Sequence, residues 1–221
     1  MSKPIVRSLR TAGLISLIAG FTLCAASLPG PTVDENRSEK KSETVVLAGG
    51  CFWGVQAVFS EIKGVTSAIS GYAGGSKANA HYEIVSTGTT GHAESVQVTF
   101  DPTQVSFGQL LKIYFSVAHD PTELNRQGPD TGTQYRSEIF YTTEEQKHIA
   151  EAYIQQLSEA KIFHGPIVTK VAPLQGFYAA EEYHQNYVAR NPHQPYVAYN
   201  DLPKLTNLRA EFPEMCKRGK Q

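Results

Sequence analysis

A short glycine-rich segment around Cys51 constrains the fold more than any other part of the sequence. The run Gly49-Gly50-Cys51-Phe52-Trp53-Gly54 lies between an apolar stretch at residues 44–48, which predicts a β-strand, and a stretch with helical periodicity. The helical stripe consists of Val55, Val58, Phe59 and Ile62. Cys51 is therefore expected at a strand-to-helix turn, where free N–H groups favour a thiolate over a thiol, whose ordinary pKa is about 8.5. A cysteine in this setting is a candidate nucleophile.

The remaining periodicities predict alternating strands and helices. Further strands are expected at residues 66–72, 92–100, 135–141 and 167–174. A further helix is expected at residues 107–118. Another is expected to begin at a capping box formed by Thr143 and Gln146, and a third is expected at residues 179–189. This order predicts an α+β two-layer sandwich with a mixed, mainly antiparallel sheet and a split-βαβ, ferredoxin-like core. Pro192 and Pro195 predict a loop-rich C-terminal segment.

The composition is that of an ordinary globular domain. The chain has 221 residues, of which 41% are hydrophobic, and a formal net charge of -1. This is enough for one domain of roughly 150 to 200 residues. The near-neutral balance gives no reason to expect nucleic acid or an anionic membrane surface as a partner.

The N-terminal residues differ in composition from the rest. Lys3, Arg7 and Arg10 precede an uncharged stretch whose apolar centre, residues 13–26, is short for a bilayer span and ends in small residues. We interpret residues 1–26 as a secretory signal peptide, which predicts an exported, periplasmic protein. An N-terminal anchor that is not cleaved and holds the protein to the membrane is the alternative.

The boundaries of the other segments follow from their composition. Residues 27–43 are predicted to be a flexible linker, because residues 31–43 are almost free of apolar side chains. Residues 44–213 contain no repeat or low-complexity run, which indicates one domain, and residues 214–221 are expected to form a mobile C-terminal tail.

Three cysteines limit the redox chemistry. Cys24 would leave with the signal peptide, and Cys51 and Cys216 alone are too few for a disulfide framework in a domain of this size. The pair could cycle between dithiol and disulfide, or it could form one structural disulfide. The sequence leaves both interpretations open.

Glu94 is the most unusual residue of the predicted strand at residues 92–100. Alternation along this strand places Glu94 on the same face as Val96, Val98 and Phe100. A carboxylate on a buried apolar face must be paired, protonated or used in function. A surface position in an edge strand is the simpler alternative.

Five strings of residues carry a resemblance to a known family. They are G-C-F-W-G from Gly50, Y-A-G-G from Tyr72, T-G-H-A-E from Thr90, D-P-T-E-L-N-R-Q-G-P-D-T-G-T-Q-Y-R-S from Asp120, and E-E-Y-H-Q-N-Y from Glu181. In this order and spacing they resemble the A-type peptide methionine sulfoxide reductases over residues 44–213. The resemblance implies an enzyme that reduces the S epimer of methionine sulfoxide, free or in proteins, to methionine.

The resemblance also implies catalytic roles for four residues. Cys51 would attack the sulfoxide sulfur as a thiolate, and Glu94, with a pKa raised by an apolar setting, would protonate the departing oxygen. Tyr82 and Tyr135 match the two tyrosines that hold this oxygen in the family. The product on the enzyme would be a Cys51 sulfenic acid.

Other matching residues would bind the substrate or support the site. Phe52 and Trp53 match the aromatic pair that forms the methyl pocket, although both could simply be core aromatics. Asp130 matches a carboxylate that positions the substrate, or it could be a turn residue beside glycines. His184 is expected to brace the site from behind. No histidine or cysteine spacing supports a metal site, so no metal or other cofactor is expected.

The sequence departs from the family at the residue that recycles the enzyme. Many relatives carry a resolving cysteine where this chain has Val197, and Cys216 is the only remaining internal candidate for that role. An external thiol, from a thioredoxin-like protein or a dithiol, must otherwise reduce the sulfenic acid. The expected partners are thus oxidised proteins or free methionine sulfoxide and this reductant, with no nucleic acid, and the chain is expected to be a monomer.

Two other function classes remain open at this point. A cysteine hydrolase or acyltransferase would use His92 or His184 as the base for Cys51. A sulfoxide-binding redox sensor would lack turnover because the resolving position has lost its cysteine.

Overall fold

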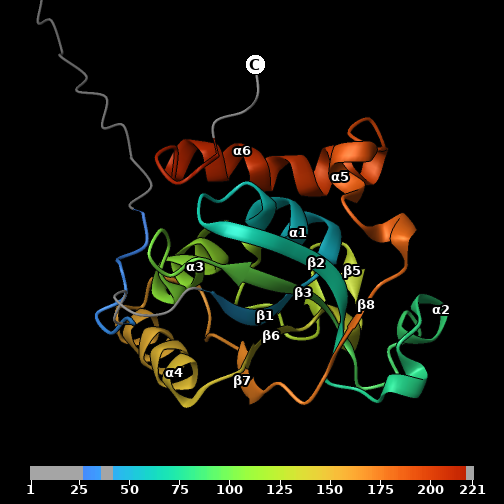
Figure 1. Ribbon diagram of the computed structural model, residues 1–221, viewed down its shortest axis with the longest axis horizontal. Helices are drawn as coiled ribbons and strands as arrows, with labels where there is room; N and C mark the ends of the chain where they lie inside the picture. Colours follow the sequence, from blue (N-terminus) through green and yellow to red (C-terminus); the bar gives the residue numbers. More distant parts are fainter. Residues whose placement is uncertain (1–26, 36–41, 218–221) are drawn as a thin grey trace, which may run out of the picture.

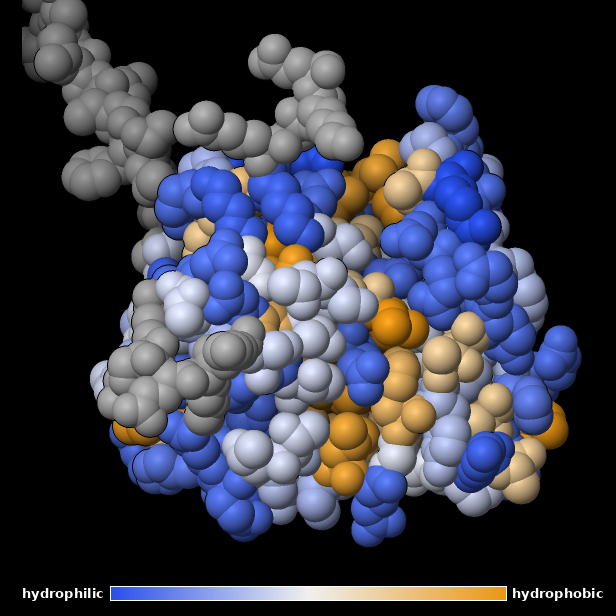
Figure 2. Space-filling view, in the orientation of Figure 1, coloured by the Kyte–Doolittle hydropathy of each residue, from blue (hydrophilic) through white to orange (hydrophobic). Residues whose placement is uncertain are grey.

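The computed structural model describes residues 27–35 and 42–217. The predicted signal peptide at residues 1–26, which includes Cys24, lies outside the described residues. In the described part of the chain, no helix is both long enough and apolar enough to span a membrane. Figure 2 shows a surface on which hydrophobic residues are interspersed among hydrophilic ones.

A six-stranded sheet forms the centre of the domain (Figure 1). Its strands, in spatial order, are β7 (Lys170–Pro173), β6 (Ser137–Tyr141), β1 (Glu43–Gly49), β3 (Ala93–Phe100), β2 (Val65–Ala73) and β8 (Phe177–Ala179). Every neighbouring pair is antiparallel except β6 and β7, which are parallel. Because β3 lies between β1 and β2, the unit of β1, the following helix and β2 is a split βαβ, and the order β6-β1-β3-β2 is ferredoxin-like. The predicted core topology is confirmed.

The main helices share one hydrophobic core on one face of this sheet. They are α1 (Phe52–Ser60), α3 (Phe107–Ile113), α4 (Glu144–Glu159) and α6 (Leu202–Glu211). Val45 and Leu47 of β1 belong to this core, whereas Val46 and Ala48 face a smaller cluster on the opposite side. Figure 1 shows α1 between α6 and the sheet. The result is the predicted two-layer arrangement, in which α1 packs directly on the sheet and α6 covers α1.

Several helix boundaries differ from the predictions for local reasons. The helix predicted at residues 107–118 is α3 followed by a π-helical turn, Tyr114–Ala118. Thr143 caps α4 by accepting a hydrogen bond from the Gln146 N–H (3.2 Å), but the Gln146 side chain accepts from the Thr142 N–H rather than completing the predicted box. Each change adjusts a helix end without moving the helix.

The prediction of a helix at residues 179–189 was wrong. β8 ends at Ala179, and a 3-10 turn (Glu182–His184) and the single-turn α5 (Tyr187–Arg190) take the place of the predicted helix. They are separated by Asn186, which adopts a left-handed conformation with φ 52°. The Gln185 side chain instead bonds to both the N–H and the carbonyl oxygen of Ser70 (3.0 and 2.9 Å). It thereby fixes this segment against β2.

The C-terminal segment is more helical than expected. A π-helical turn, Val197–Asp201, leads into α6, which carries Pro203 in its first turn. Proline is tolerated in the first turn of a helix. Leu205 and Leu208 then bury one side of α6 in the main core.

The prediction of a flexible linker was also wrong for residues 27–35, which pack on the domain. Asp34 accepts hydrogen bonds from the Ser106 hydroxyl (2.5 Å) and the Gly108 N–H (2.9 Å), and the buried Glu35 accepts one from the Phe107 N–H (2.6 Å). Two neighbouring carboxylates therefore satisfy the free N–H groups at the start of α3. The buried Leu28 and these two carboxylates together anchor the segment.

We expect Asp34→Ala to lower the free energy of unfolding by about 1 kcal/mol, the usual cost of losing a helix cap. Urea unfolding would measure this difference, and hydrogen exchange would show faster exchange at the start of α3. Asp34→Asn, which keeps an acceptor oxygen, is the matched control and should lose less stability. Equal stability of Asp34→Ala and the parent chain would contradict the capping role.

The tail prediction was wrong for residues 214–217, which dock at the end of α1. The Lys63 N–H donates to the Met215 carbonyl (2.8 Å), and the Lys217 N–H donates to the Glu61 carbonyl (2.7 Å). These bonds enclose an isolated bridge between Ile62 and Cys216. The backbone pairing, rather than an apolar pattern, fixes the tail.

Candidate active site

Cys51 is the residue that connects β1 to α1. It occupies the N-cap position of α1, as predicted, and its side chain is buried. Gly50 precedes it with φ +88°, and a Cβ at that position would lie 2.6 Å from the Cβ of Gln127. Both the backbone conformation and the close approach therefore require glycine before the cysteine.

Glu94 reaches the same point from β3. Its carboxylate is buried, and its Oε2 accepts a hydrogen bond from the N–H of Phe52 (3.1 Å), the first residue of α1. The alternation predicted for this strand is confirmed, and the alternative of an exposed edge position is wrong.

A pocket of about 260 Å³ opens beside Cys51 and Glu94. Its lining comprises Cys51, Phe52, Trp53, Tyr82, Glu94, Asp130, Tyr135, Gln194 and Tyr196. All the residues predicted as catalytic or substrate-binding thus meet in one pocket. Sequence reasoning missed Gln194 and Tyr196, although both lie in the proline-flanked run that contains Val197.

The electrostatics of the pocket favour protonated groups. Burial raises the pKa of Glu94 to about 8, with a smaller contribution from Asp130, against the lowering effect of the Phe52 N–H. Burial also raises the pKa of the Cys51 thiol, and the charges of Glu94 and Asp201 raise it further. The thiolate preference predicted from the helix start is therefore outweighed by burial and by two carboxylates from distant elements.

The two tyrosines retain their protons for the same reason. Burial is the main cause that raises the pKa of Tyr82 and of Tyr135, followed by the charge of Glu94. Tyr82 is held in place through Glu181, which accepts from the Tyr82 N–H (3.0 Å) and from the Tyr72 hydroxyl (2.8 Å). Both phenols can act as hydrogen-bond donors toward an oxygen in the pocket.

Trp53 forms a fixed aromatic wall. Its ring stacks on Tyr187 with centroids 3.7 Å apart, and its Nε1–H donates to Nδ1 of His184 (3.1 Å). Burial lowers the pKa of His184, in keeping with a neutral ring that accepts this bond. The His184 ring also lies 4.4 Å from that of Tyr82 and 5.0 Å from that of Phe52, between centroids. His184 thus contacts Trp53, Tyr82 and Phe52 without lining the pocket itself.

Asp130 and Tyr196 close another side of the pocket. Asp130 begins β5 (Asp130–Thr131), which pairs with β4 (Arg126–Gln127) in a small hairpin. The Tyr196 hydroxyl donates a hydrogen bond to Oδ2 of Asp130. This bond joins the hairpin to the C-terminal segment and forms one wall of the site.

Cys216 lies away from the residues that line the Cys51 pocket. Its thiol donates to the Phe212 carbonyl (3.3 Å), and it pairs with Ile62 beyond the end of α1. Cys51 stands at the opposite end of α1, whose nine residues span about 14 Å. A bond between the two sulfurs would require residues 214–217 to detach from the end of α1. Val197, at the position of the resolving cysteine in many relatives, is fully buried.

Two further histidines, His92 and His119, have structural partners. Nε2 of His92 bonds with the Ser76 carbonyl (2.9 Å), and Nδ1 of His119 bonds with the Tyr114 carbonyl (3.0 Å). Within residues 27–35 and 42–217, no group of His, Cys, Asp and Glu side chains is arranged to hold a metal ion.

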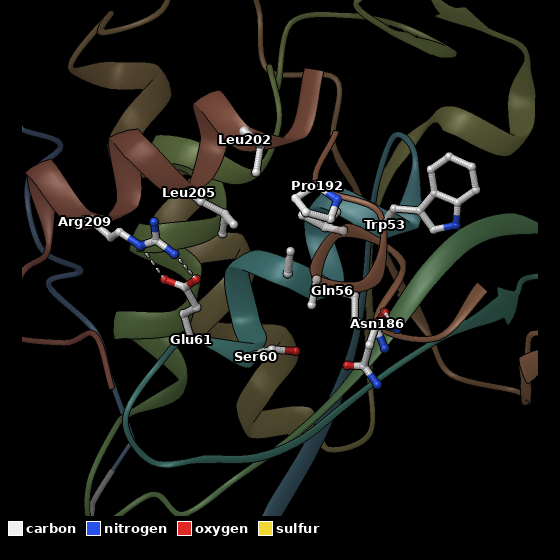
Figure 3. Close-up of a pocket in the computed structure, with 12 residues that line it drawn as sticks. Trp53, Gln56, Ser60, Glu61, Asn186, Pro192, Leu202, Leu205 and Arg209 are labelled. Carbon is white, nitrogen blue, oxygen red and sulfur yellow. Dashed lines mark hydrogen bonds and ion pairs between the residues drawn. The ribbon is translucent and has the colours of Figure 1, made fainter. Parts of the chain in front are cut away.

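A second pocket, of about 280 Å³, lies between α1 and the C-terminal helices (Figure 3). Apolar side chains such as Leu202, Leu205 and Pro192 line it, and the ion pair of Arg209 with Glu61 closes one end. It shares Trp53 with the Cys51 pocket but contains neither the thiol nor Glu94. The chemistry therefore belongs to the Cys51 pocket.

Comparison with known proteins agrees with this arrangement. Residues 43–215 match the family profile described as peptide methionine sulfoxide reductase. The chain belongs to this family. This reductase is 56% identical over 181 residues to peptide methionine sulfoxide reductase MsrA 2 of Mesorhizobium japonicum. The match covers 82% of this chain and 93% of that relative. It is 50% identical over 210 residues to MsrA 2 of Synechocystis sp., covering 93% and 98% of the two chains.

Solved structures show the same fold for this reductase. Reduced Mxr1 from Saccharomyces cerevisiae is 32% identical with a TM-score of 0.64, covering 74% of this chain and 92% of that one. Methionine sulfoxide reductase A of Corynebacterium diphtheriae is 38% identical with a TM-score of 0.60, covering 73% and 81%. The predicted family, fold class and enzyme class are confirmed, and the protein is an oxidoreductase.

Proposed function

We propose that this reductase converts the S epimer of methionine sulfoxide, free or in proteins, to methionine with Cys51 as nucleophile and Glu94 as proton donor. The observation that carries the proposal is one pocket that contains a buried cysteine and a carboxyl group whose pKa is raised to about 8. At neutral pH such a carboxyl group is protonated and can donate to the oxygen of a sulfoxide.

The proposed first step balances without a cofactor. The Cys51 sulfur bonds to the sulfoxide sulfur while Glu94 gives its proton to the sulfoxide oxygen and the thiol proton returns to Glu94. The protonated oxygen then passes to the Cys51 sulfur as the bonds from the substrate sulfur to oxygen and to Cys51 break. The substrate sulfur is reduced by two electrons, and Cys51 is oxidised to a sulfenic acid. Since an ionised Glu94 raises the pKa of Cys51, a neutral Glu94 also makes ionisation of the thiol less costly.

The other pocket residues position the substrate in this proposal. Tyr82 and Tyr135 donate hydrogen bonds to the sulfoxide oxygen. Phe52 and Trp53 enclose the methyl group, because apolar walls accept it and offer no partner to a second polar group. Asp130, held by Tyr196, faces the substrate main chain.

Reduction of the Cys51 sulfenic acid to the thiol needs an external reductant in this proposal. Val197 stands at the usual resolving position, and Cys216 is held by a backbone bridge to Ile62 beyond the far end of α1. We propose a thioredoxin-like dithiol as this reductant. We also propose that the protein is exported to the periplasm, on the grounds of the charged and apolar pattern at residues 1–26. We propose in addition that it acts as a monomer.

Two alternatives are less well supported by the geometry. Acyl transfer would need a histidine base beside Cys51, yet Nδ1 of His184 accepts from Trp53, and His92 bonds with Ser76. A redox sensor without turnover would bind sulfoxide through the same residues, so only kinetics separate it from an enzyme.

The proposal is tested by steady-state kinetics with the separated S and R epimers of a blocked methionine sulfoxide and dithiothreitol as reductant. We expect many turnovers of the S epimer and a rate with the R epimer that is lower by about 100-fold or more, since its oxygen and methyl group would exchange places in the pocket. A single equivalent of methionine without further turnover would favour the sensor. Equal rates with both epimers would contradict the proposed pocket.

A further inference from the structure

A second, smaller pocket of about 90 Å³ reaches Cys51 from another side. Asp130 and Tyr196 line both pockets and, through their hydrogen bond, stand between them. Glu94, Phe52 and Tyr135 line only the larger pocket, whereas Gln127, Asn200 and Lys204 line only the smaller one. Cys51 is therefore accessible from two sides of different chemistry.

The smaller pocket contains a cation, Lys204, in addition to the shared Asp130, whereas the larger pocket contains two carboxyl groups and several aromatic rings. Lys204 in α6 supplies the ammonium group of this pocket. Its Cδ lies 3.2 Å from the point where a Cβ would stand if Gly54 had a side chain. Its charge lowers the pKa of Cys51, Asp130 and Asp201, although other causes outweigh it at each group. Lys204 is thus close enough to act on an anion beside the cysteine.

Asp201 packs beside Lys204 against the start of α1. It is 1% exposed, and neither carboxylate oxygen has a hydrogen-bond partner among the described residues. Its Oδ1 would collide with a Cβ on Gly54, so the last glycine of the G-C-F-W-G run leaves room for the carboxylate and for the Lys204 stem. Both side chains therefore pack against the first turn of α1, next to Cys51.

We propose that the smaller pocket admits the thiolate that reduces the Cys51 sulfenic acid; this proposal rests on the proposed function. The sulfenic oxygen comes from the substrate and lies on the side of Glu94 and the tyrosines. A nucleophile that displaces it must approach the sulfur from a different side, and the pocket with Lys204 provides that side. The ligand chemistry is a thiolate on an unbranched carbon, carried by a small dithiol or by a protein dithiol.

The reaction balances with this reductant alone. The thiolate sulfur bonds to Cys51 sulfur, the S–O bond breaks, and the oxygen leaves as water with the proton that the thiol released. The second thiol of the reductant then attacks the sulfur of the first. Cys51 is released as a thiolate, and the reductant leaves as a disulfide.

The test separates the two halves of the reaction. Reduced enzyme is mixed with one equivalent of the S epimer, methionine release is measured, and the decay of the Cys51 sulfenic acid is then followed by quenched flow and mass analysis. Dithiothreitol and reduced thioredoxin are the two reductants. The variants are Lys204→Met, Lys204→Glu and Lys204→Arg, with Lys170→Met on the exposed edge strand β7 as the matched control.

We expect Lys204→Met to slow the decay by about tenfold, Lys204→Glu to slow it further and Lys204→Arg to restore most of the rate, because a cation attracts the incoming thiolate. Methionine release in the first half should change far less. A slower decay with only one reductant supports the proposal and identifies the source of the thiolate.

Decay rates of the Lys204 variants equal to that of Lys170→Met, with both reductants, would overturn the proposal and leave the proposed function intact. Absence of methionine release from the parent enzyme would instead overturn the proposed function, and this proposal with it.

Discussion

Cys51→Ser is expected to abolish sulfoxide reduction, with a loss of turnover on the order of 10^4-fold or more, because the variant removes the sulfur atom on which the sulfenic acid forms. The serine hydroxyl occupies nearly the same volume at the N-cap of α1, and serine is a favourable N-cap residue, so the fold should be retained. Turnover of the S epimer with dithiothreitol measures the effect. Circular dichroism and thermal unfolding verify that the variant is folded.

Cys216→Ser is the matched control for that experiment. The Cys216 thiol is hydrogen-bonded to the Phe212 carbonyl near the end of α1 that is opposite Cys51. Loss of this thiol should therefore change turnover by less than about twofold. Mass analysis after one turnover should show a Cys51 sulfenic acid or a mixed disulfide with the reductant. A disulfide of Cys51 with Cys216, together with a large loss of rate in Cys216→Ser, would show that the tail detaches and resolves the enzyme internally.

The patterns that predicted the fold correctly are local ones. The alternation of β3 placed Glu94 on the buried face, and the periodicity after Cys51 placed the cysteine at the start of α1. In both cases the relevant neighbours lie within a few residues along the chain. The family strings contain six of the nine residues that line the pocket, whereas Tyr82, Gln194 and Tyr196 lie outside them.

The features that the sequence did not reveal depend on contacts between distant segments. Asp201 and Lys204 reach Cys51 only because the C-terminal turn and α6 fold back across α1, and nothing in their own spacing indicates this. Burial is the main cause of the raised pKa of Cys51, and the charges of Glu94 and Asp201, which come from other elements, raise it further. Similarly, Asp34 and Glu35 looked like solvated charges until α3 brought N–H groups to them.

Replacement of the acid should produce the second large effect. In Glu94→Gln we expect the rate of methionine formation in a single turnover to fall by about 10²- to 10⁴-fold, the usual contribution of a general acid. The amide of the variant side chain would keep an acceptor oxygen for the Phe52 N–H and a donor toward the substrate, so binding of the sulfoxide should change little. A loss of rate with little change in the binding of substrate is the expected combination.

The pH dependence gives this prediction its sharpest form. The acid works only while Glu94 is protonated, and its pKa is about 8, so the single-turnover rate of the parent enzyme should fall as pH rises through 8. Because this pKa is raised above the ordinary value of 4.5, the carboxyl group also contributes stability that is fully present below pH 4.5 and is lost as pH rises through 8. Glutamine does not titrate, so both effects should disappear together in Glu94→Gln. If the variant kept the parent rate, or kept a rate decrease near pH 8, Glu94 would have no role as the acid, and one of the phenols beside it, Tyr82 or Tyr135, would have to supply the proton.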